Sequence, residues 1–382
     1  MNRKRRIAGG VIGGVLGAAA TGAAVGVATR WSRLSRERRA IEADSGATPE
    51  LGLLPPGTPW SVTADDGVRL DAEVVELTGG PNGGRKRNDG PSQTVVLVHG
   101  FALDRRCWHF QRRALAELAD PRVRLVLFDQ RGHGRSERPP RESCTIAQLG
   151  EDLDAVLRAL APEGPVVLVG HSMGGMAIMA LAERHPELFA DRIAGVALLC
   201  TSAGEIGSQG LPATFMSRYN PLTRTVGALA GWQPRLVERA RRLIGDLVWG
   251  VTRAYAYGDR KVAHWLVDFV HQMISANAVD ALIDFVDTLN THDRLAALPA
   301  LARCRTLIVA GEADRMIPLR HGEVIAAELP DATMVRLPGV GHMAMIEQPE
   351  QVNEALAELL RRVAADRPGG VVGALRKLRK RA

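Results

Sequence analysis

Six short runs of Val, Leu and Ile recur along the sequence, and each is bounded by turn residues. Their hydrophobicity is continuous rather than alternating, which is typical of strands buried on both faces of a parallel sheet. Segments with helical periodicity separate them. This alternation predicts a doubly wound, mostly parallel α/β fold, in which ligands bind at the carboxyl ends of the strands. The runs are residues 94–100, 123–132, 165–172, 193–202, 305–314 and 332–339.

The alternation of strands and helices stops after residue 202 and resumes at residue 305. The sequence between them contains apolar-striped helices and no good strand, which indicates a helical insertion above the strand ends, a cap. Aromatic residues are only 4% of the chain but concentrate here, and we expect most of them to form the core of the cap. The predicted organisation is a basic amino terminus at 1–40, a linker at 41–59, an α/β core at 60–204 and 296–365, the cap at 205–295 and a basic tail at 366–382.

Positive charge is concentrated at the two ends of the chain, whose net charge is +7. The first 40 residues carry nine Lys or Arg and a single Glu, and the run RKLRKR at 376–381 adds five positive charges. The rest of the chain is therefore net acidic. This distribution argues against a nucleic-acid groove and indicates that the ends meet an anionic surface such as lipid head groups. Solvated, disordered tails are the alternative.

Residues 7–29 form an uncharged segment directly behind the basic run NRKRR. A membrane-spanning helix needs about 20 residues, so the segment is long enough to cross a bilayer. Gly9, Gly13 and Gly17 recur at the spacing that lets membrane helices approach closely, which would allow a homodimer. We predict a single-pass anchor in a bacterial cell membrane, with the basic tail as a second membrane contact. A cleaved signal peptide followed by secretion, or a soluble flexible arm, are the alternatives.

The motif VGHSMGG follows the apolar run PVVLV and places Ser172 between small residues. A strand that must reverse into a helix within one or two residues strains its turn residue, and glycine neighbours make the turn sterically feasible. The frame from Gly170 to Gly174 is therefore typical of a nucleophilic serine exposed at the start of a helix. A serine that only caps the helix is the alternative interpretation.

A serine nucleophile needs a base and a carboxylate that orients the base. The base is expected on the loop after the last strand, where LPGVGHMAMIEQP supplies His342; His321, at the start of a helix, and His271, in the cap, fit less well. The carboxylate is expected after the penultimate strand, within LIVAGEADRMIP. Asp314 is preferred there because it lies later on the exit loop, and Glu312 is the second candidate.

An oxyanion hole needs two backbone N–H donors. The amide of Met173, directly after the serine, is one candidate. The other is the amide of Phe101 in VHGFALD, where Gly100 lets the backbone turn inward. In the next exit loop, FDQRGHGRS, we expect Asp129 and the neighbouring Arg and His residues to hold the loop together rather than to react.

The sequence predicts no metal site and no cofactor. Its four cysteines form no C-x-x-C pair and have no histidine at metal-ligand spacing, so we interpret them as free thiols or buried apolar residues, with a disulfide between two of them as the alternative. They are Cys107, Cys144, Cys200 and Cys304.

The chain from about Trp60 to Ala365 resembles the α/β-hydrolase superfamily, since HGF, FDQRGHGRS, GHSMGG, GEADRMIP and GVGHM occur in that family's order and spacing. It is most similar to the capped serine esterases, the monoacylglycerol lipase-like proteins and the cofactor-free haloperoxidase-like proteins. The resemblance implies Ser172 as nucleophile, His342 as base and Asp314 as its orienter. Relatives that use an aspartate nucleophile are disfavoured because a serine occupies that position.

The leading functional hypothesis is a serine hydrolase that cleaves carboxylic esters, with acyl lipids or fatty esters as substrates suited to a membrane-proximal chain with an apolar cap. Acyl transfer to an alcohol or to peroxide would use the same residues. A noncatalytic ligand-binding homologue is the third hypothesis, and an intact set of catalytic residue types argues against it.

Overall fold

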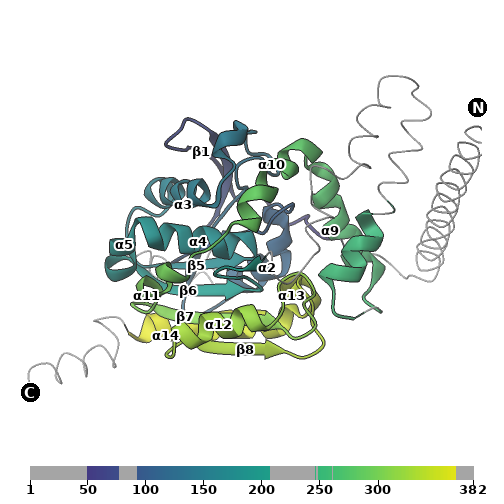
Figure 1. Ribbon diagram of the computed structural model, residues 1–382. Helices are drawn as coiled ribbons and strands as arrows, with labels where there is room; N and C mark the ends of the chain where they lie inside the picture. Colours follow the sequence, from purple (N-terminus) through teal and green to yellow (C-terminus); the bar gives the residue numbers. More distant parts are fainter. Residues whose placement is uncertain (1–49, 77–92, 207–245, 247, 260, 367–382) are drawn as a thin grey trace, which may run out of the picture.

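The strands in the described part of the chain form one eight-stranded sheet at the centre of the fold (Figure 1). Their order is β1-β2-β4-β3-β5-β6-β7-β8. The first two strands form an antiparallel hairpin around Asp65, Asp66 and Gly67, and β2 also pairs antiparallel with β4. All other neighbours are parallel. The strands are β1 (Thr58–Thr63), β2 (Arg69–Val75), β3 (Gln93–Val98), β4 (Val123–Phe128), β5 (Val166–His171), β6 (Ile193–Leu199), β7 (Arg305–Gly311) and β8 (Thr333–Leu337).

Helices follow the parallel strands, as the alternation predicts. The helices of the α/β core are α2 (His109–Ala116), α3 (Ile146–Leu160), α4 (Met173–Arg184), α5 (Pro186–Asp191), α11 (Leu298–Leu301), α12 (Arg320–Glu328), α13 (Ala344–Glu347) and α14 (Pro349–Ala365). Between β6 and β7 lie helical residues 248–256, α9 (His264–Ala276) and α10 (Val279–Asn290). Short 3₁₀ turns occur at Arg105–Trp108, Arg141–Ser143 and Leu295–Ala297.

The alternation of side chains along each central strand divides the hydrophobic core into two layers. Val96 and Val98 of β3 face the layer that contains α3, α4 and α12. Val95 and Leu97 face the other layer, which contains α2 and α14. All four side chains are fully buried, because helices cover both faces of the sheet. The continuous apolar runs in the sequence are a consequence of this double burial.

The order in which successive strands are added to the sheet reverses beside β3. β4 lies on one side of β3 and β5 on the other, so the connections that leave β3 and β5 run in opposite directions. In open α/β sheets, ligands bind at the carboxyl ends of the strands at such a point. Phe101 follows β3 and Ser172 follows β5. The topology therefore brings two of the predicted site segments to the same edge.

The segment between β6 and β7 is attached to the rest of the fold where it begins and ends, and also at the turn between α9 and α10. Its two ends meet in a bridge between Gly204 and Asp293. Asn277, between α9 and α10, donates a hydrogen bond of 3.0 Å to the carbonyl of Ala102 and accepts one of 3.2 Å from the amide of Gly134. The α9–α10 turn thus rests on the exit loops of both β3 and β4.

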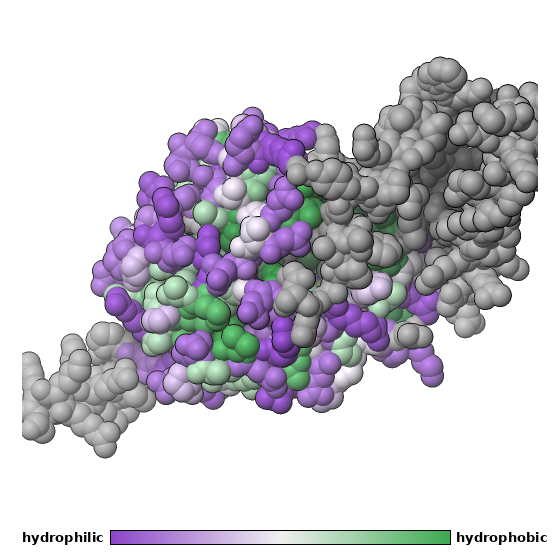
Figure 2. All heavy atoms as spheres, in the orientation of Figure 1, coloured by the Kyte–Doolittle hydropathy of each residue, from purple (hydrophilic) through white to green (hydrophobic). Residues whose placement is uncertain are grey.

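Most of the aromatic side chains described in this segment pack inward, as the sequence predicts. Trp249, Tyr257, Phe269 and Phe285 are buried. The Trp249 indole also donates a hydrogen bond of 2.8 Å to Asp268 in α9, which joins two helices of the segment. The exposed surface is mixed and mainly hydrophilic on the face drawn in Figure 2. Among the residues that the structure describes, the exposed large hydrophobic side chains are Leu53, Trp60, Leu295 and Val324.

This description covers residues 50–76, 93–206, 246, 248–259 and 261–366. Within those ranges no helix is long and apolar enough to cross a membrane. The predicted anchor at 7–29 and the basic tail from residue 367 onward lie outside them. The four cysteines are unpaired thiols, and three of them are buried.

Candidate active site

Ser172 occupies a strained turn between β5 and α4. Its φ of +53° and ψ of −118° lie in a region that non-glycine residues rarely adopt, and its side chain makes no capping hydrogen bond to the helix. The backbone is held from both sides: the Ser172 amide donates to the Leu199 carbonyl at 2.9 Å, and its carbonyl accepts from Gly175 at 2.9 Å. Strain of this kind persists where neighbouring structure enforces it, and it is common at functional sites.

The glycines around Ser172 are required by close backbone approaches. A Cβ on Gly170 would lie 2.6 Å from the amide nitrogen of Gly175, and one on Gly174 would lie 2.2 Å from the carbonyl oxygen of Val98. Both contacts are far shorter than a real Cβ tolerates. Glycine at these positions therefore lets α4 start directly against the ends of β5 and β3.

Asp314 and His342 meet through a hydrogen bond of 2.8 Å between Asp314 Oδ2 and His342 Nδ1. Their side chains are 1% and 5% exposed. The other carboxylate oxygen of Asp314 accepts hydrogen bonds from the amides of Met316 at 2.8 Å and Ile317 at 2.9 Å. Glu312, the second candidate, is exposed. The structure thus brings together the preferred carboxylate and the predicted base.

His171 connects the serine turn to the loop of His342. Its Nε2 lies 2.9 Å from the His342 carbonyl oxygen, and the two imidazole rings are 4.8 Å apart between centroids. Burial holds the pKa of His171 well below its usual value, and the neighbouring His342 lowers it further, so the ring is neutral. Nε2–H is then the donor to the carbonyl. Sequence reasoning missed this role, although its position directly before Ser172 was a usable signal.

The loop after β3 carries Phe101 to the serine. A Cβ on Gly100 would lie 3.2 Å from the Ser172 Cβ, which shows how closely this loop approaches the serine. The amides of Phe101 and Met173 donate no hydrogen bond to any acceptor in the described part of the chain. Two N–H groups near Ser172 are therefore available for a ligand oxygen.

His99 sets the direction of the Phe101 amide. The Gln130 amide donates to His99 Nε2 at 2.9 Å, so the ring proton lies on Nδ1, which donates to the Gly100 carbonyl at 2.8 Å. In a trans peptide the C=O and the following N–H point in opposite directions. Fixing the Gly100 carbonyl consequently fixes the N–H of Phe101. Burial lowers the pKa of His99, which favours this neutral form.

A model of the alpha/beta hydrolase family matches residues 95–355, which span the serine turn, the Asp314 loop and the His342 loop. The chain belongs to the alpha/beta hydrolase family. RutD of Caulobacter sp. (strain K31), named as a candidate carbamate hydrolase, is 29% identical to this hydrolase over 297 residues, which are 78% of this chain and 98% of that protein.

Solved structures of the same fold include enzymes of different activities. An esterase from Thermogutta terrifontis is 25% identical, with a TM-score of 0.58, and the match covers 80% of this hydrolase and 99% of that chain. A bromoperoxidase from Bacillus anthracis is 22% identical with a TM-score of 0.58, covering 79% and 99%. At that identity the likeness concerns the fold alone. The resemblance inferred from the sequence motifs is confirmed.

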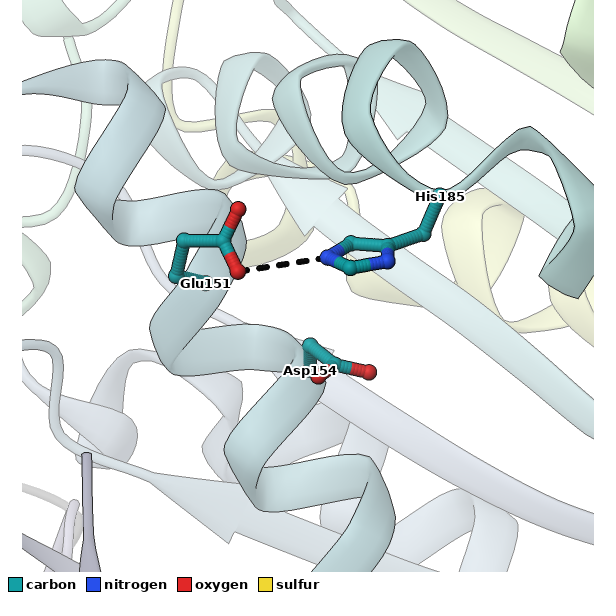
Figure 3. A group of neighbouring side chains, drawn as sticks. All are labelled: Glu151, Asp154 and His185. Carbon is teal, nitrogen blue, oxygen red and sulfur yellow. Dashed lines mark hydrogen bonds and ion pairs between the residues drawn. The ribbon is translucent and has the colours of Figure 1, made fainter. Parts of the chain in front are cut away.

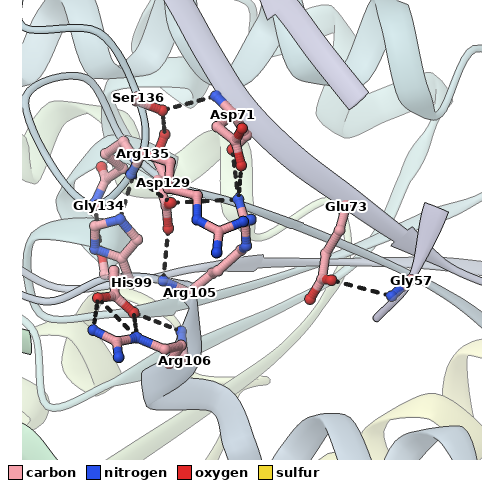
Figure 4. A network of polar contacts seen from close by, with 12 residues as sticks. Gly57, Asp71, Glu73, His99, Arg105, Arg106, Asp129, Gly134, Arg135 and Ser136 are labelled. Carbon is pink, nitrogen blue, oxygen red and sulfur yellow. Dashed lines mark hydrogen bonds and ion pairs between the residues drawn. The ribbon is translucent and has the colours of Figure 1, made fainter. Parts of the chain in front are cut away.

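Asp129 lies at the centre of the polar network shown in Figure 4, in the loop after β4. It accepts hydrogen bonds from the amides of Arg105 at 2.8 Å and Arg135 at 2.9 Å, and the Arg105 guanidinium bridges it to Asp71. Burial raises the pKa of Asp129, while Arg105 acts against that shift. Together these contacts join the exit loops of β3 and β4 to each other and to β2. The network has the structural role expected for this loop from the sequence.

Two groups of side chains in the described residues have the spacing of metal ligands. One comprises Glu151, Asp154 and His185 (Figure 3), and the other comprises Asp65, Asp66 and Asp152. Arginines pair with both groups. His185 follows the far end of α4, and a 12-residue helix spans about 18 Å. The first group is thus remote from Ser172, and neither group takes part in the candidate site.

Proposed function

We propose that this hydrolase cleaves carboxylic esters through an acyl-enzyme formed on Ser172. The strained turn at Ser172 carries this proposal, together with the hydrogen bond from His171 that joins this turn to the loop of the His342–Asp314 pair. His342 Nε2 takes the hydroxyl proton as Ser172 Oγ attacks the ester carbonyl, and Asp314 keeps the proton of the imidazole on Nδ1 and stabilises the imidazolium.

The amides of Phe101 and Met173 would stabilise the oxyanion of the tetrahedral intermediate. Collapse of this intermediate expels the alcohol, which takes its proton from His342. Water activated by the same histidine then hydrolyses the acyl-enzyme and regenerates Ser172. The proposed steps draw on residues that follow the ends of β3, β5 and β7 and on the loop after β8.

Acyl lipids or fatty esters are the substrates we propose. The described helices between β6 and β7 present apolar and aromatic side chains toward the core below them, and they rest on the loop that carries Phe101. We also propose that residues 7–29 anchor the chain in a bacterial membrane and that the basic tail contacts anionic head groups. Substrates dissolved in the bilayer would then reach the site by lateral diffusion.

The decisive test uses the full-length chain with a p-nitrophenyl ester series from acetate to palmitate, together with covalent labelling by a fluorophosphonate. We expect Ser172→Ala to abolish both turnover and labelling, because the nucleophile is removed. The ester of highest kcat/KM reports the length of the acyl pocket. A long-chain optimum would support the lipid proposal, and an optimum at acetate would contradict it.

Ser202→Ala is the matched control. Ser202 is fully buried and also lies beside a histidine, with its Oγ 2.9 Å from His321 Nδ1. This variant should keep its label on Ser172, located by mass spectrometry of the labelled peptide. Labelling that persists in Ser172→Ala would overturn the proposal, and so would the absence of labelling and of ester turnover in the folded wild-type chain.

A further inference from the structure

The backbone around His342 is held by groups outside the serine turn. The Gly341 amide donates a hydrogen bond of 2.7 Å to Glu347 Oε2, and the Met343 amide donates one of 2.9 Å to the carbonyl of Ala256. These bonds flank His342 on both sides. His342, the proposed base, is consequently held in part by α13, which ends at Glu347, and in part by the helical segment 248–256 of the cap.

The same carboxylate also binds the end of that helical segment. Glu347 Oε1 accepts hydrogen bonds of 3.0 Å from the amides of both Gly258 and Asp259, and its Oε2 lies 3.1 Å from the Gly258 nitrogen. A charged carboxylate makes stronger bonds to backbone N–H groups than a neutral acceptor does. One side chain thus joins the cap to the residue directly before His342.

The two backbones are in direct contact at this point. A Cβ on Gly258 would lie 2.0 Å from the Gly339 carbonyl oxygen, and a Cβ on Gly341 would lie 2.4 Å from the Gly258 nitrogen. No side chain fits between the cap segment and the His342 loop. A displacement of one backbone must therefore be transmitted to the other.

The Asp314 loop binds the same end of the helical segment. The guanidinium of Arg315 donates hydrogen bonds of 2.7 Å to the carbonyl of Ala254 and 3.2 Å to that of Tyr257. A cation is favourable at the C-terminal end of a helix, where carbonyls lack partners within the helix. Both residues of the His342–Asp314 pair are thus attached to one segment of the cap.

We propose that Glu347 is a positioning residue for His342, and that it couples the cap segment 254–259 to proton transfer at Ser172. This inference rests on the proposed serine-hydrolase function. Glu347 acts through the Gly341 backbone, and the reacting atoms are not among its partners. All of its hydrogen-bond partners here are N–H donors, so only a residue that offers two acceptor oxygens satisfies them.

Glu347→Gln tests this inference in the full-length chain. An amide replaces one acceptor oxygen by an NH₂ group that faces other N–H donors, so the His342 loop should shift. Because a misplacement of about 1 Å can cost roughly 100-fold in rate, we expect kcat on p-nitrophenyl butyrate to fall by about 10- to 100-fold, with KM changed less than about threefold. The rate of fluorophosphonate labelling of Ser172 should fall in parallel.

Glu354→Gln is the matched control, since Glu354 is an exposed glutamate on α14. It should leave kcat and the labelling rate unchanged. Glu347→Asp is the second variant. It keeps the carboxylate but shortens the side chain by one methylene group, so its kcat should fall in the same way. It tests the inference even if Glu347→Gln fails to fold. Unchanged kcat and labelling in folded Glu347 variants would overturn the inference while leaving the function intact. Failure of the function is recognised separately, by a wild-type chain that neither labels nor turns over.

Discussion

The two carboxylate oxygens of Asp314 have different partners. Oδ2 accepts the Nδ1 proton of His342, and Oδ1 accepts the amides of Met316 and Ile317. The backbone amides fix the orientation of the carboxylate, and this orientation in turn fixes the imidazole. The side chain is buried, so water does not compete for either oxygen.

Asp314→Asn should keep the fold and lose most of the activity. The asparagine NH₂ would face either the two backbone amides or His342 Nδ1, and in the latter case it would favour the imidazole tautomer with the proton on Nε2, which cannot accept the serine proton. We expect kcat for ester hydrolysis to fall on the order of 10³- to 10⁴-fold, measured with the best p-nitrophenyl ester.

Glu312→Gln serves as the control, because Glu312 lies two residues away and is exposed. It should retain nearly full activity. Full activity in Asp314→Asn combined with a large loss in Glu312→Gln would contradict this prediction, because it would make Glu312 rather than Asp314 the carboxylate that orients His342.

At the scale of elements, the position of α4 against β3 sets the site. The helix begins at Met173, and its second residue, Gly174, passes directly over the carbonyls of Val98 and His99. The start of a helix carries a partial positive charge and free N–H groups, which suit an oxyanion. The close approach brings these groups next to the loop of Phe101.

Gly174→Ala should therefore move the helix that carries the nucleophile. A Cβ would lie 2.2 Å from the Val98 oxygen and 2.7 Å from the His99 oxygen, and backbone atoms cannot rotate away. Overpacking of this kind costs about 1–3 kcal/mol. We expect the free energy of unfolding, measured by urea denaturation, to fall by that amount and the rate of Ser172 labelling to fall with it.

Gly322→Ala is a comparison from α12, a second helix that packs on the sheet. Its new Cβ would approach only side chains, the nearest at 3.2 Å, so a small adjustment suffices. If both alanine variants had wild-type stability and labelling rates, the close approach of α4 to β3 would have no functional importance.

At the scale of the whole molecule, the α/β core and the ends of the chain have opposite charge. The positive charge resides in the first 40 residues and in the run at 376–381, and the remainder is net acidic. An acidic body favours separation from anionic head groups, whereas the basic ends favour contact with them. The proposed anchor would thus hold the core near a membrane, while the acidic core itself would be repelled by the anionic lipids and would not adsorb to the membrane surface.

The membrane proposal predicts where the full-length chain is recovered after expression in bacteria. It should sediment with membranes and remain there after an alkaline carbonate wash, because a spanning helix resists extraction that removes electrostatically bound proteins. A variant that lacks residues 7–29 should move to the supernatant and keep its ester turnover. Recovery of the intact full-length chain in the supernatant would contradict the proposed anchor.

The sequence by itself determined the fold class and the candidate site residues. Continuous apolar runs are typical of strands that are buried on both faces, and the glycines around Ser172 reflect a turn that excludes side chains, so both signals are local. The preference for Asp314 over Glu312 depended on loop position, and the hydrogen bond to His342 shows that the chain uses that carboxylate for this contact.

Only the tertiary structure decided which distant groups hold the site in place. His171 and Glu347 bond to the backbone of another segment, and His99 accepts a hydrogen bond from the Gln130 amide and donates one to the Gly100 carbonyl. Backbone amides and carbonyls carry no sequence signature. The same is true of the cap, whose contacts with the loops of Phe101 and His342 depend on the path of the chain between β6 and β7. Side-chain periodicity encodes burial and turns, while long-range hydrogen bonds to the backbone arise when the fold brings these segments together.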